Sequence, residues 1–445
     1  MRTILAFPPV SRELKLKEMR SRPPMGIYTL AGALRSEGFN IKTADPLQLE
    51  EAVYENGQES EKILKHFIEE ADVLGVSCNS YNWGAAIILI DKARKINANL
   101  IVILGGLYPT RFPVYSMRRV SADYVVRGEG EKTLVQLLKA IETGLNPVGK
   151  IPGVVSNKEP IEKALEPVLL TKKEIGAVMP AYDLIPDIYN SISIESSRGC
   201  TNSCLFCGVP YRKTWRELEP QIVEKRLTNG LINFDKRMPG REVFFAEDCF
   251  TTDSNRALKI LNIIKEWDCS ALVQGRVDNF LNLSFLENVP WDNIASLQLG
   301  IECGYNEGLK KIAKGITLNQ VEVVLDTIAR LGVAHLTIGS FVIGFPWETE
   351  KEYMSTLHYA ASLSYKYGIN ISTSILGLYP SSTLWETRDR YGIAVDETIF
   401  DDPNWMLDMD LFFRMHQNLN KQELDKIQKL IETYGLLGSS LINIA

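Results

Sequence analysis

The sequence predicts an α/β protein: an N-terminal doubly wound parallel sheet, a Rossmann-like arrangement, followed by a partial (β/α)6 barrel of the TIM type and a small helical C-terminal segment. Short apolar runs alternate with helical stripes over residues 1–143, and the same rhythm returns over 191–395. Between them, residues 144–190 hold six prolines and little periodicity. We therefore expect two domains joined by a linker at 144–190, with the helical segment at 396–445.

The first series contains five short apolar runs that end at turn residues, which is typical of buried parallel strands. They span residues 2–7, 40–45, 71–78, 100–106 and 122–128. Between the first two, Ile27, Leu30, Ala31 and Leu34 have helical spacing. Doubly wound sheets bind ligands at the carboxyl ends of their strands, where the strand order reverses. The segments that follow these runs are therefore candidates for ligand binding.

The second series has candidate strands that start near residues 191, 242, 270, 295, 334 and 368. Six β/α units in about 200 residues favour a barrel that is incomplete. The tail holds an amphipathic helix in "KQELDKIQKLIETYGLL" and the stretch "NWMLDMDLFFRM", which we expect to cap the barrel mouth.

Composition narrows the class of protein. A net charge of -6 and a pI near 5.6 argue against a sequence-independent nucleic-acid binder. The opening apolar run is too short for a signal peptide, and no eighteen apolar residues run together, so we expect a cytoplasmic protein without a transmembrane segment. Seven cysteines in 445 residues do not form the disulfide framework of a small secreted domain.

Three of these cysteines, Cys200, Cys204 and Cys207, form C-x3-C-x2-C just past the first strand of the second series. Structural zinc usually has four ligands, and this loop offers three without a neighbouring histidine. An iron–sulfur cluster held by three thiolates leaves one iron free for a substrate or cofactor. The count favours a catalytic [4Fe-4S] cluster over zinc and over three unrelated cysteines.

The stretch "SSRGCTNSCLFC", with Phe206 before the third cysteine, resembles the signature of the radical S-adenosylmethionine (SAM) superfamily. The resemblance implies that SAM chelates the open iron and that the reduced cluster donates an electron to the sulfonium. The C–S bond then breaks to give a 5′-deoxyadenosyl radical, which abstracts a hydrogen atom from the substrate. An external reductant such as flavodoxin or ferredoxin is implied as a partner.

Charged residues after later strands match positions at which this superfamily binds SAM. The resemblance implies that Glu247, ahead of Asp248, meets the SAM ammonium group and that Arg276 binds the carboxylate. It also assigns Glu302 to the ribose hydroxyls and adds Lys314 as a candidate. Each charge alone is more often a surface ion, but their order along the strand ends favours function.

The adenine of SAM would contact Phe206 and the glycine-bearing segment "FVIGFPWET", which contains Ile343 and Gly344. Two residues depart from the superfamily pattern. Cys303 stands where serine is commoner, and Trp347 stands where glycine is commoner. We interpret Cys303 as a small core thiol, and Trp347 as a residue that narrows the pocket or packs beside it.

The first series resembles the cobalamin-binding domain that precedes many radical SAM enzymes. The similar stretches are "PPMGIYTLAGALRSEGFNIKTAD", "ADVLGVSCNSYNWGAA", "VILGG" and "ADYVVRGEGEKTL". The candidate cobalamin contacts are Asn79, Tyr81, Asn82, Trp83, Gly105, Gly106, Gly128, Glu129 and Gly130. Glycine lets the backbone approach a bulky ligand, although turn glycines belong to any doubly wound sheet.

No histidine is placed to ligate cobalt. His66 is the only histidine of residues 1–143, and it lacks the D-x-H-x-x-G context of mutase-type domains. We expect cobalamin to bind with its own base displaced and its lower face against Asn79, Tyr81, Asn82 or Trp83. Methylthiotransferases carry a second, three-cysteine cluster on this domain; since only Cys78 is present here, that group is excluded.

Our leading hypothesis is a cobalamin-dependent radical SAM C-methyltransferase that uses methylcobalamin and a 5′-deoxyadenosyl radical on an unactivated carbon. The alternatives are a cyclase or rearrangement enzyme with the same cofactors, a radical SAM enzyme whose first domain binds no cobalamin, and a non-enzymatic iron or zinc sensor. The substrate class stays open among small molecules, lipids, tetrapyrroles and peptides.

Overall fold

The computed structural model describes residues 1–11, 13, 22–189, 191–234 and 241–438. Contacts divide the chain into two compact units: Met1–Tyr189 with Asp396–Trp405, and Asn190–Val395 with Met406–Ala445. The stretch 144–189, expected as a linker, thus lies in the first unit. The last residues of the predicted C-terminal segment, 439–445, lie outside the described residues.

The first unit is built on a six-stranded sheet with the order β2-β1-β3-β4-β5-β6. Its strands are β1 (Arg2–Ala6), β2 (Asn40–Ala44), β3 (Val73–Ser77), β4 (Ile101–Gly105), β5 (Tyr124–Val126) and β6 (Val154–Ser156). All pairs are parallel except β5 with β6. The predicted doubly wound sheet is confirmed, and its strand order reverses between β1 and β3.

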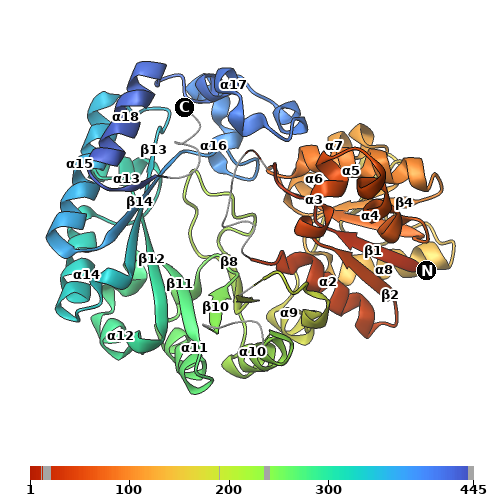
Figure 1. Ribbon diagram of the computed structural model, residues 1–445, viewed down its shortest axis with the longest axis horizontal. Coiled ribbons are helices and arrows are strands. Elements are labelled where there is room, and N and C mark those ends of the chain that lie inside the picture. The colour runs from red at the N-terminus through yellow and green to blue at the C-terminus, as the bar shows by residue number, and fades with distance from the viewer. Residues whose placement is uncertain (12, 14–21, 190, 235–240, 439–445) are drawn as a thin grey trace. The chain divides into compact units, whose positions relative to one another are not determined.

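Helices cover both sides of this sheet (Figure 1). The helices of the first unit are α2 (Met25–Ser36), α3 (Pro46–Tyr54), α4 (Gln58–Ile68), α5 (Trp83–Ile96), α6 (Leu107–Arg111), α7 (Pro113–Arg119), α8 (Gly130–Glu142) and α9 (Lys172–Ala177). The helix α2 packs with α8, while α3, α4 and α5 pack with one another. This two-sided cover explains why the inner strands β3 and β4 are almost entirely apolar, whereas the edge strand β2 exposes Asn40 and Lys42.

The carboxylate of Asp45 ties residue 189 to the first unit. Asp45 caps α3 by accepting from Leu47 N at 3.0 Å. It also accepts from the hydroxyls of Tyr28 at 2.6 Å and Tyr189 at 2.7 Å, both buried. A buried carboxylate needs such partners, so Tyr189 is anchored in the first unit, whereas residues 157–169 of the predicted linker are mostly exposed.

The second unit is built on a seven-stranded parallel sheet with the order β15-β14-β13-β12-β11-β10-β7. Its strands are β7 (Ile192–Ile194), β10 (Glu242–Phe245), β11 (Ser270–Arg276), β12 (Ile294–Glu302), β13 (Thr337–Ile343), β14 (Asn370–Ile375) and β15 (Leu437–Gly438). The first six agree with the predicted strands. Since β7 and β15 are the two edges, the barrel is open, and Figure 1 shows its strands curving inside a layer of helices.

The helices of the second unit are α10 (Pro220–Phe234), α11 (Ser254–Glu266), α12 (Leu283–Asn288), α13 (Asn306–Lys311), α14 (Leu318–Arg330), α15 (Glu350–Tyr367), α16 (Thr383–Glu386), α17 (Met409–Met415) and α18 (Lys421–Thr433). A separate antiparallel hairpin joins β8 (Ser197–Cys200) to β9 (Thr214–Glu217). Over the part of the chain that the structure describes, no helix is long and apolar enough to cross a membrane.

Candidate functional site

The three signature cysteines lie at the end of the hairpin β8–β9, an element that the sequence did not predict. Cys200 is the last residue of β8 and pairs with Thr214. Gly199 has φ of +87°, and a Cβ there would lie 2.0 Å from Thr214 O, so only glycine allows this turn of the chain. Leu205 N donates to Ile312 O at 2.9 Å, which fixes the cysteine loop within the second unit.

The pKa values of Cys200 and Cys207 shift in opposite directions. Burial raises the pKa of Cys207 to about 11, and the thiols of Cys204 and Cys200 add to the rise. A hydrogen bond from the Cys249 thiol lowers the pKa of Cys200, helped by Asn202 N at 3.4 Å from the sulfur. Cys249 is a fourth cysteine beside the triplet that sequence spacing did not reveal.

Three thiols in one loop are the donor set that the sequence predicts for an iron–sulfur cluster. Within the described residues, no group of three or more histidine, cysteine, aspartate or glutamate side chains is arranged to hold one metal ion. A four-iron cluster takes each thiolate on a different iron, so Cys200, Cys204 and Cys207 need not converge on one point. They would hold three irons and leave the fourth without a protein ligand.

Arg276, predicted as a SAM ligand, contacts the cysteine loop directly. Its Nη1 donates to Cys204 Sγ at 3.3 Å, and its Nε donates to Asp278 Oδ1 at 2.9 Å. Its Nη2 donates to Lys314 O. The buried guanidinium therefore places its positive charge against the sulfur of Cys204.

Glu302 and Lys314, predicted separately, form an ion pair of 2.8 Å. Their side chains are 12% and 5% exposed, so the pair is nearly buried. Glu302 has φ of +79° at a register shift between β12 and β13. A left-handed backbone at a non-glycine residue is costly and is held only by its surroundings. A Cβ on Gly300 would lie 2.6 Å from Glu302 Oε1, so glycine makes room for this pair.

Of the two acidic residues after β10, Asp248 is the more accessible. Glu247 accepts from Ser196 Oγ at 2.7 Å and from Ser197 Oγ, and burial raises its pKa to about 7. Asp248 is exposed and accepts from Gly199 N at 3.0 Å. The geometry thus gives Asp248 more freedom than Glu247 to meet a ligand.

A buried glutamate, Glu348, accepts hydrogen bonds from the backbone of the turn after β13. Gly344 has φ of +86°, and its N–H donates to Glu348 Oε2 at 2.7 Å. Phe345 N donates to the same oxygen at 3.0 Å, and Tyr305 Oη donates to Oε1 at 3.1 Å. Burial raises the pKa of Glu348 to about 7. The preceding Ile343 is fully buried.

Trp347 extends a row of aromatic rings at this turn. Phe206 lies edge-on to Phe345 with ring centres 5.7 Å apart, and Phe345 stacks on Trp347 at 5.2 Å. The indole Nε1 of Trp347 donates to Tyr305 Oη at 3.2 Å. The residue that departs from the superfamily pattern therefore packs beside the predicted adenine contacts. Cys303 is a buried core thiol, as its sequence context suggested.

Two residues of the C-terminal segment fix the same turn and were missed by the sequence analysis. His416 Nδ1 lies 3.1 Å from Gly344 O, and burial lowers the pKa of the imidazole to about 4. Asn418 Nδ2 donates to Phe345 O at 2.9 Å. These contacts join residues some seventy positions apart, so no local sequence motif predicts them.

In the first unit, the loop after β3 uses most of its polar groups internally. Asn79 N donates to Asn82 Oδ1 at 2.8 Å, and Tyr81 N donates to Asn79 Oδ1 at 2.9 Å. Asn82 is buried and donates to Pro8 O at 2.9 Å, and Trp83 is fully buried. Asn79 and Tyr81 are the half-buried members of the predicted set.

The predicted glycines differ in what they face. A Cβ on Gly106, at φ of +91°, would lie 2.5 Å from Cys78 O, whereas a Cβ on Gly105 would meet nothing closer than 3.8 Å. Gly128 and Gly130 approach Pro167 and Leu30, and Glu129 accepts from Leu170 N at 2.6 Å. Gly105 therefore leaves the most room for a ligand, together with Asn79 and Tyr81.

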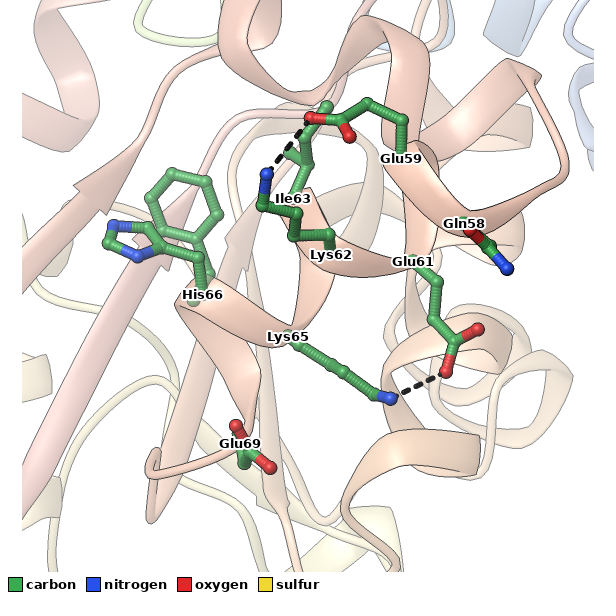
Figure 2. A pocket seen from close by; sticks show the side chains of 9 residues that line it. Gln58, Glu59, Glu61, Lys62, Ile63, Lys65, His66 and Glu69 are labelled. Carbon is green, nitrogen blue, oxygen red and sulfur yellow. Dashed lines mark ion pairs between the residues drawn. The ribbon is translucent and has the colours of Figure 1, made fainter.

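A shallow hollow of about 840 Å³ lies along α4, away from the predicted residues except His66 (Figure 2). Its side chains form ion pairs along the helix, Lys62 with Glu59 and Lys65 with Glu61. Such pairs are typical of a solvated helix face. His66 lies on this helix face as expected of a helix residue, but it is exposed, whereas its sequence context suggested a partly buried position.

The two units match two family models. Residues 21–138 match the B12 binding domain, and residues 194–360 match the radical SAM superfamily. An uncharacterized methyltransferase of Pyrococcus horikoshii is 31% identical over 88% of this chain and 83% of its own. The chain spans between 41% and 64% of the length of three other curated relatives.

Solved structures with the same fold include two radical SAM proteins with cobalamin bound. The enzyme OxsB, with aqua-cobalamin and SAM bound, aligns with a TM-score of 0.71 at 18% identity over 97% of this chain and 71% of its own. The methyltransferase TsrM from Kitasatospora setae, with cobalamin and a [4Fe-4S] cluster bound, aligns with a TM-score of 0.65 at 17% identity over 89% of this chain and 76% of its own.

The fold and the cysteine loop define a radical SAM enzyme that also carries a B12-binding domain. The chain belongs to the family of the Pyrococcus protein. The predicted resemblance to cobalamin-binding radical SAM enzymes is confirmed. The three predicted cofactors of this class of enzyme, cobalamin, a [4Fe-4S] cluster and SAM, are confirmed as well.

Proposed function

We propose that this chain is a cobalamin-dependent radical SAM C-methyltransferase that acts on an unactivated carbon. One observation carries the proposal: Arg276 contacts both the three-cysteine loop and the backbone of Lys314, which forms an ion pair with Glu302. The same chain also has a B12-binding domain. When bound, the cluster supplies an electron for SAM cleavage and cobalamin supplies a carrier for the methyl group.

Each candidate site residue of the second unit has a separate role in this proposal. The thiolates of Cys200, Cys204 and Cys207 hold the cluster, and Arg276 stabilises their negative charge. Glu302, held by Lys314, accepts from the ribose hydroxyls of SAM. The adenine packs against Phe206 and the turn at Gly344, whose aromatic neighbours exclude water.

Asp248 binds the ammonium group of SAM in preference to Glu247, because Asp248 is the more exposed residue of the two, although burial also raises the pKa of its carboxyl group. Glu247 then acts by orienting Ser196 and Ser197 at the base of the hairpin. In the first unit, Asn79, Tyr81 and Gly105 contact cobalamin, and no histidine ligates the metal. An external one-electron reductant such as flavodoxin or ferredoxin and a cytoplasmic location belong to the same proposal.

The test is the mass of the product formed from SAM with a trideuterated methyl group. Candidate small molecules, lipids, tetrapyrroles and peptides are incubated anaerobically with the reconstituted protein, hydroxocobalamin and a reductant. Methylation adds one trideuterated methyl group to the product. A product whose mass lacks this group, formed together with 5′-deoxyadenosine, would instead identify a cyclase or rearrangement enzyme.

A further inference from the structure

Asp396–Trp405, here called the strap, is the part of the C-terminal half that belongs to the first unit. Its anchor is the carboxylate of Asp401, which accepts hydrogen bonds of 2.7 Å from three side chains. The donors are Trp83 Nε1, Tyr115 Oη and Arg119 Nε. They lie at the start of α5 and on α7, two helices that are separate in the sequence.

A second anchor is the buried indole of Trp405. Its Nε1 donates to Ser80 O at 3.1 Å, and its ring centre lies 6.1 Å from that of Tyr81 and 5.0 Å from that of Phe400. The strap therefore bonds to the backbone of the loop after β3 and packs on one of its accessible side chains.

The backbone of the strap closely approaches the first turn of α5. A Cβ on Gly84 would lie 2.4 Å from Pro403 N, so only glycine permits the approach. The strap also contacts the segments that follow two other strands. After β1, Ser11 Oγ donates to Asn404 Oδ1, and after β4, Tyr108 Oη donates to Glu397 O at 2.8 Å. The strap thus contacts the segments after β1, β3 and β4, which include the edge where the strand order reverses.

We propose that the strap positions the loop after β3 for cobalamin, with Asp401 and Trp405 as positioning residues. The inference rests on the proposed function. Trp83 is fully buried and donates its Nε1–H to Asp401, while Ser80 gives its carbonyl to Trp405. The strap thereby sets the backbone course between them, which carries Tyr81 and follows Asn79. The binding of a ligand to this loop therefore depends on a segment more than three hundred residues away in the sequence.

The test uses the full chain with its cluster reconstituted, titrated anaerobically with hydroxocobalamin. We expect Asp401→Asn to raise the dissociation constant about tenfold, since hydrogen bonds to a charged acceptor are lost. Trp405→Phe keeps a ring and removes only the bond to Ser80 O, so we expect a rise of about fivefold. Glu397→Gln is the matched control, because no anchoring contact of this strap carboxylate is found among the described residues, and it should bind corrin as the wild type does.

A positioning role also predicts a spectroscopic change. The electron paramagnetic resonance spectrum of the bound Co(II) form should differ between the wild type and Trp405→Phe, because the loop proposed to contact cobalamin moves. Cleavage of SAM without corrin should be equal in all variants. The inference is overturned if Asp401→Asn and Trp405→Phe, with unchanged thermal midpoints, bind corrin with the wild-type constant and spectrum. A wild type that binds no corrin would instead overturn the cobalamin part of the proposed function.

Discussion

The cysteine loop of the second unit and the carboxyl edge of the first sheet differ in how they can hold a ligand. At the cysteine loop, charged and soft groups face one another: three thiols, Arg276 and the pair of Glu302 with Lys314. At the carboxyl edge, the predicted side chains mostly bond to the chain itself, as Asn82 and Trp83 do. The first region therefore offers a ligand charged and soft side chains, and the second offers mainly shape and backbone.

The largest expected effect separates the two regions. We expect Cys204→Ala to lose cluster iron and to reduce 5′-deoxyadenosine formation under dithionite to the background of a reaction without protein. Corrin binding should stay, because the first unit does not use this thiol. Cys269→Ala, at another buried cysteine, is the control and should keep its iron. Equal iron content in Cys204→Ala and the wild type would contradict the assignment of the cluster.

The nearly buried ion pair should matter through charge balance. We expect Lys314→Met to lower the free energy of unfolding by about 3 kcal/mol, because the Glu302 carboxylate then lacks its partner. The double variant Lys314→Met with Glu302→Gln should regain most of this loss. Urea unfolding curves measure both values, and a double variant no more stable than the single one would argue against the charge explanation.

In the first unit, backbone shape should matter more than charge. We expect Gly106→Ala to cost about 2 kcal/mol of unfolding free energy, because it places a Cβ at positive φ against Cys78 O. Gly26→Ala, on α2 with open space around it, should instead stabilise the chain by about 0.5 kcal/mol. If both changes had the same sign and size in thermal unfolding, the close approach at Gly106 would not be a constraint.

The smallest effect is a pH dependence in the second unit. The pKa of His416 is about 4 in the folded chain and 6.5 in the unfolded one, so the unfolded chain binds more protons between these values. Stability from this group is complete above pH 6.5 and is lost as the pH falls towards 4. Relative to His416→Gln, the wild type should lose about 2 kcal/mol between pH 7 and pH 5.

The comparison with His416→Gln is needed because two other groups act in the opposite direction. Glu247 and Glu348 have raised pKa values near 7, so their contributions fall as the pH rises from about 4.5 towards 7. They are present in both proteins and cancel in the difference. Parallel stability curves for the wild type and the variant would show that His416 does not titrate as expected.

Features with local chemistry could be predicted from the sequence, and features made by distant contacts could not. The strand centres follow from apolar runs, and Cys200, Cys204 and Cys207 follow from their spacing. Cys249 beside Cys200 and the approach of the strap to Gly84 depend on the folded chain. The prolines of residues 144–190 suggested a linker. However, Tyr189, near the end of this stretch, donates a hydrogen bond from its hydroxyl to Asp45 in the first unit.

The same limit explains the division of "NWMLDMDLFFRM". We expected this stretch to close the barrel mouth, but Asn404 and Trp405 belong to the first unit, whereas Met406 onward belongs to the second. Apolar and aromatic residues indicate that a segment is buried, but they do not indicate which surface buries it.

The most direct test of a two-cofactor enzyme is the corrin and 5′-deoxyadenosine content of one anaerobic preparation. The chain is reconstituted with iron and sulfide, incubated with hydroxocobalamin, desalted, and then given SAM and dithionite. We predict that corrin absorbance stays with the protein in stoichiometric amount and that 5′-deoxyadenosine accumulates. Cluster iron and SAM cleavage without any retained corrin would contradict the proposal that cobalamin takes part.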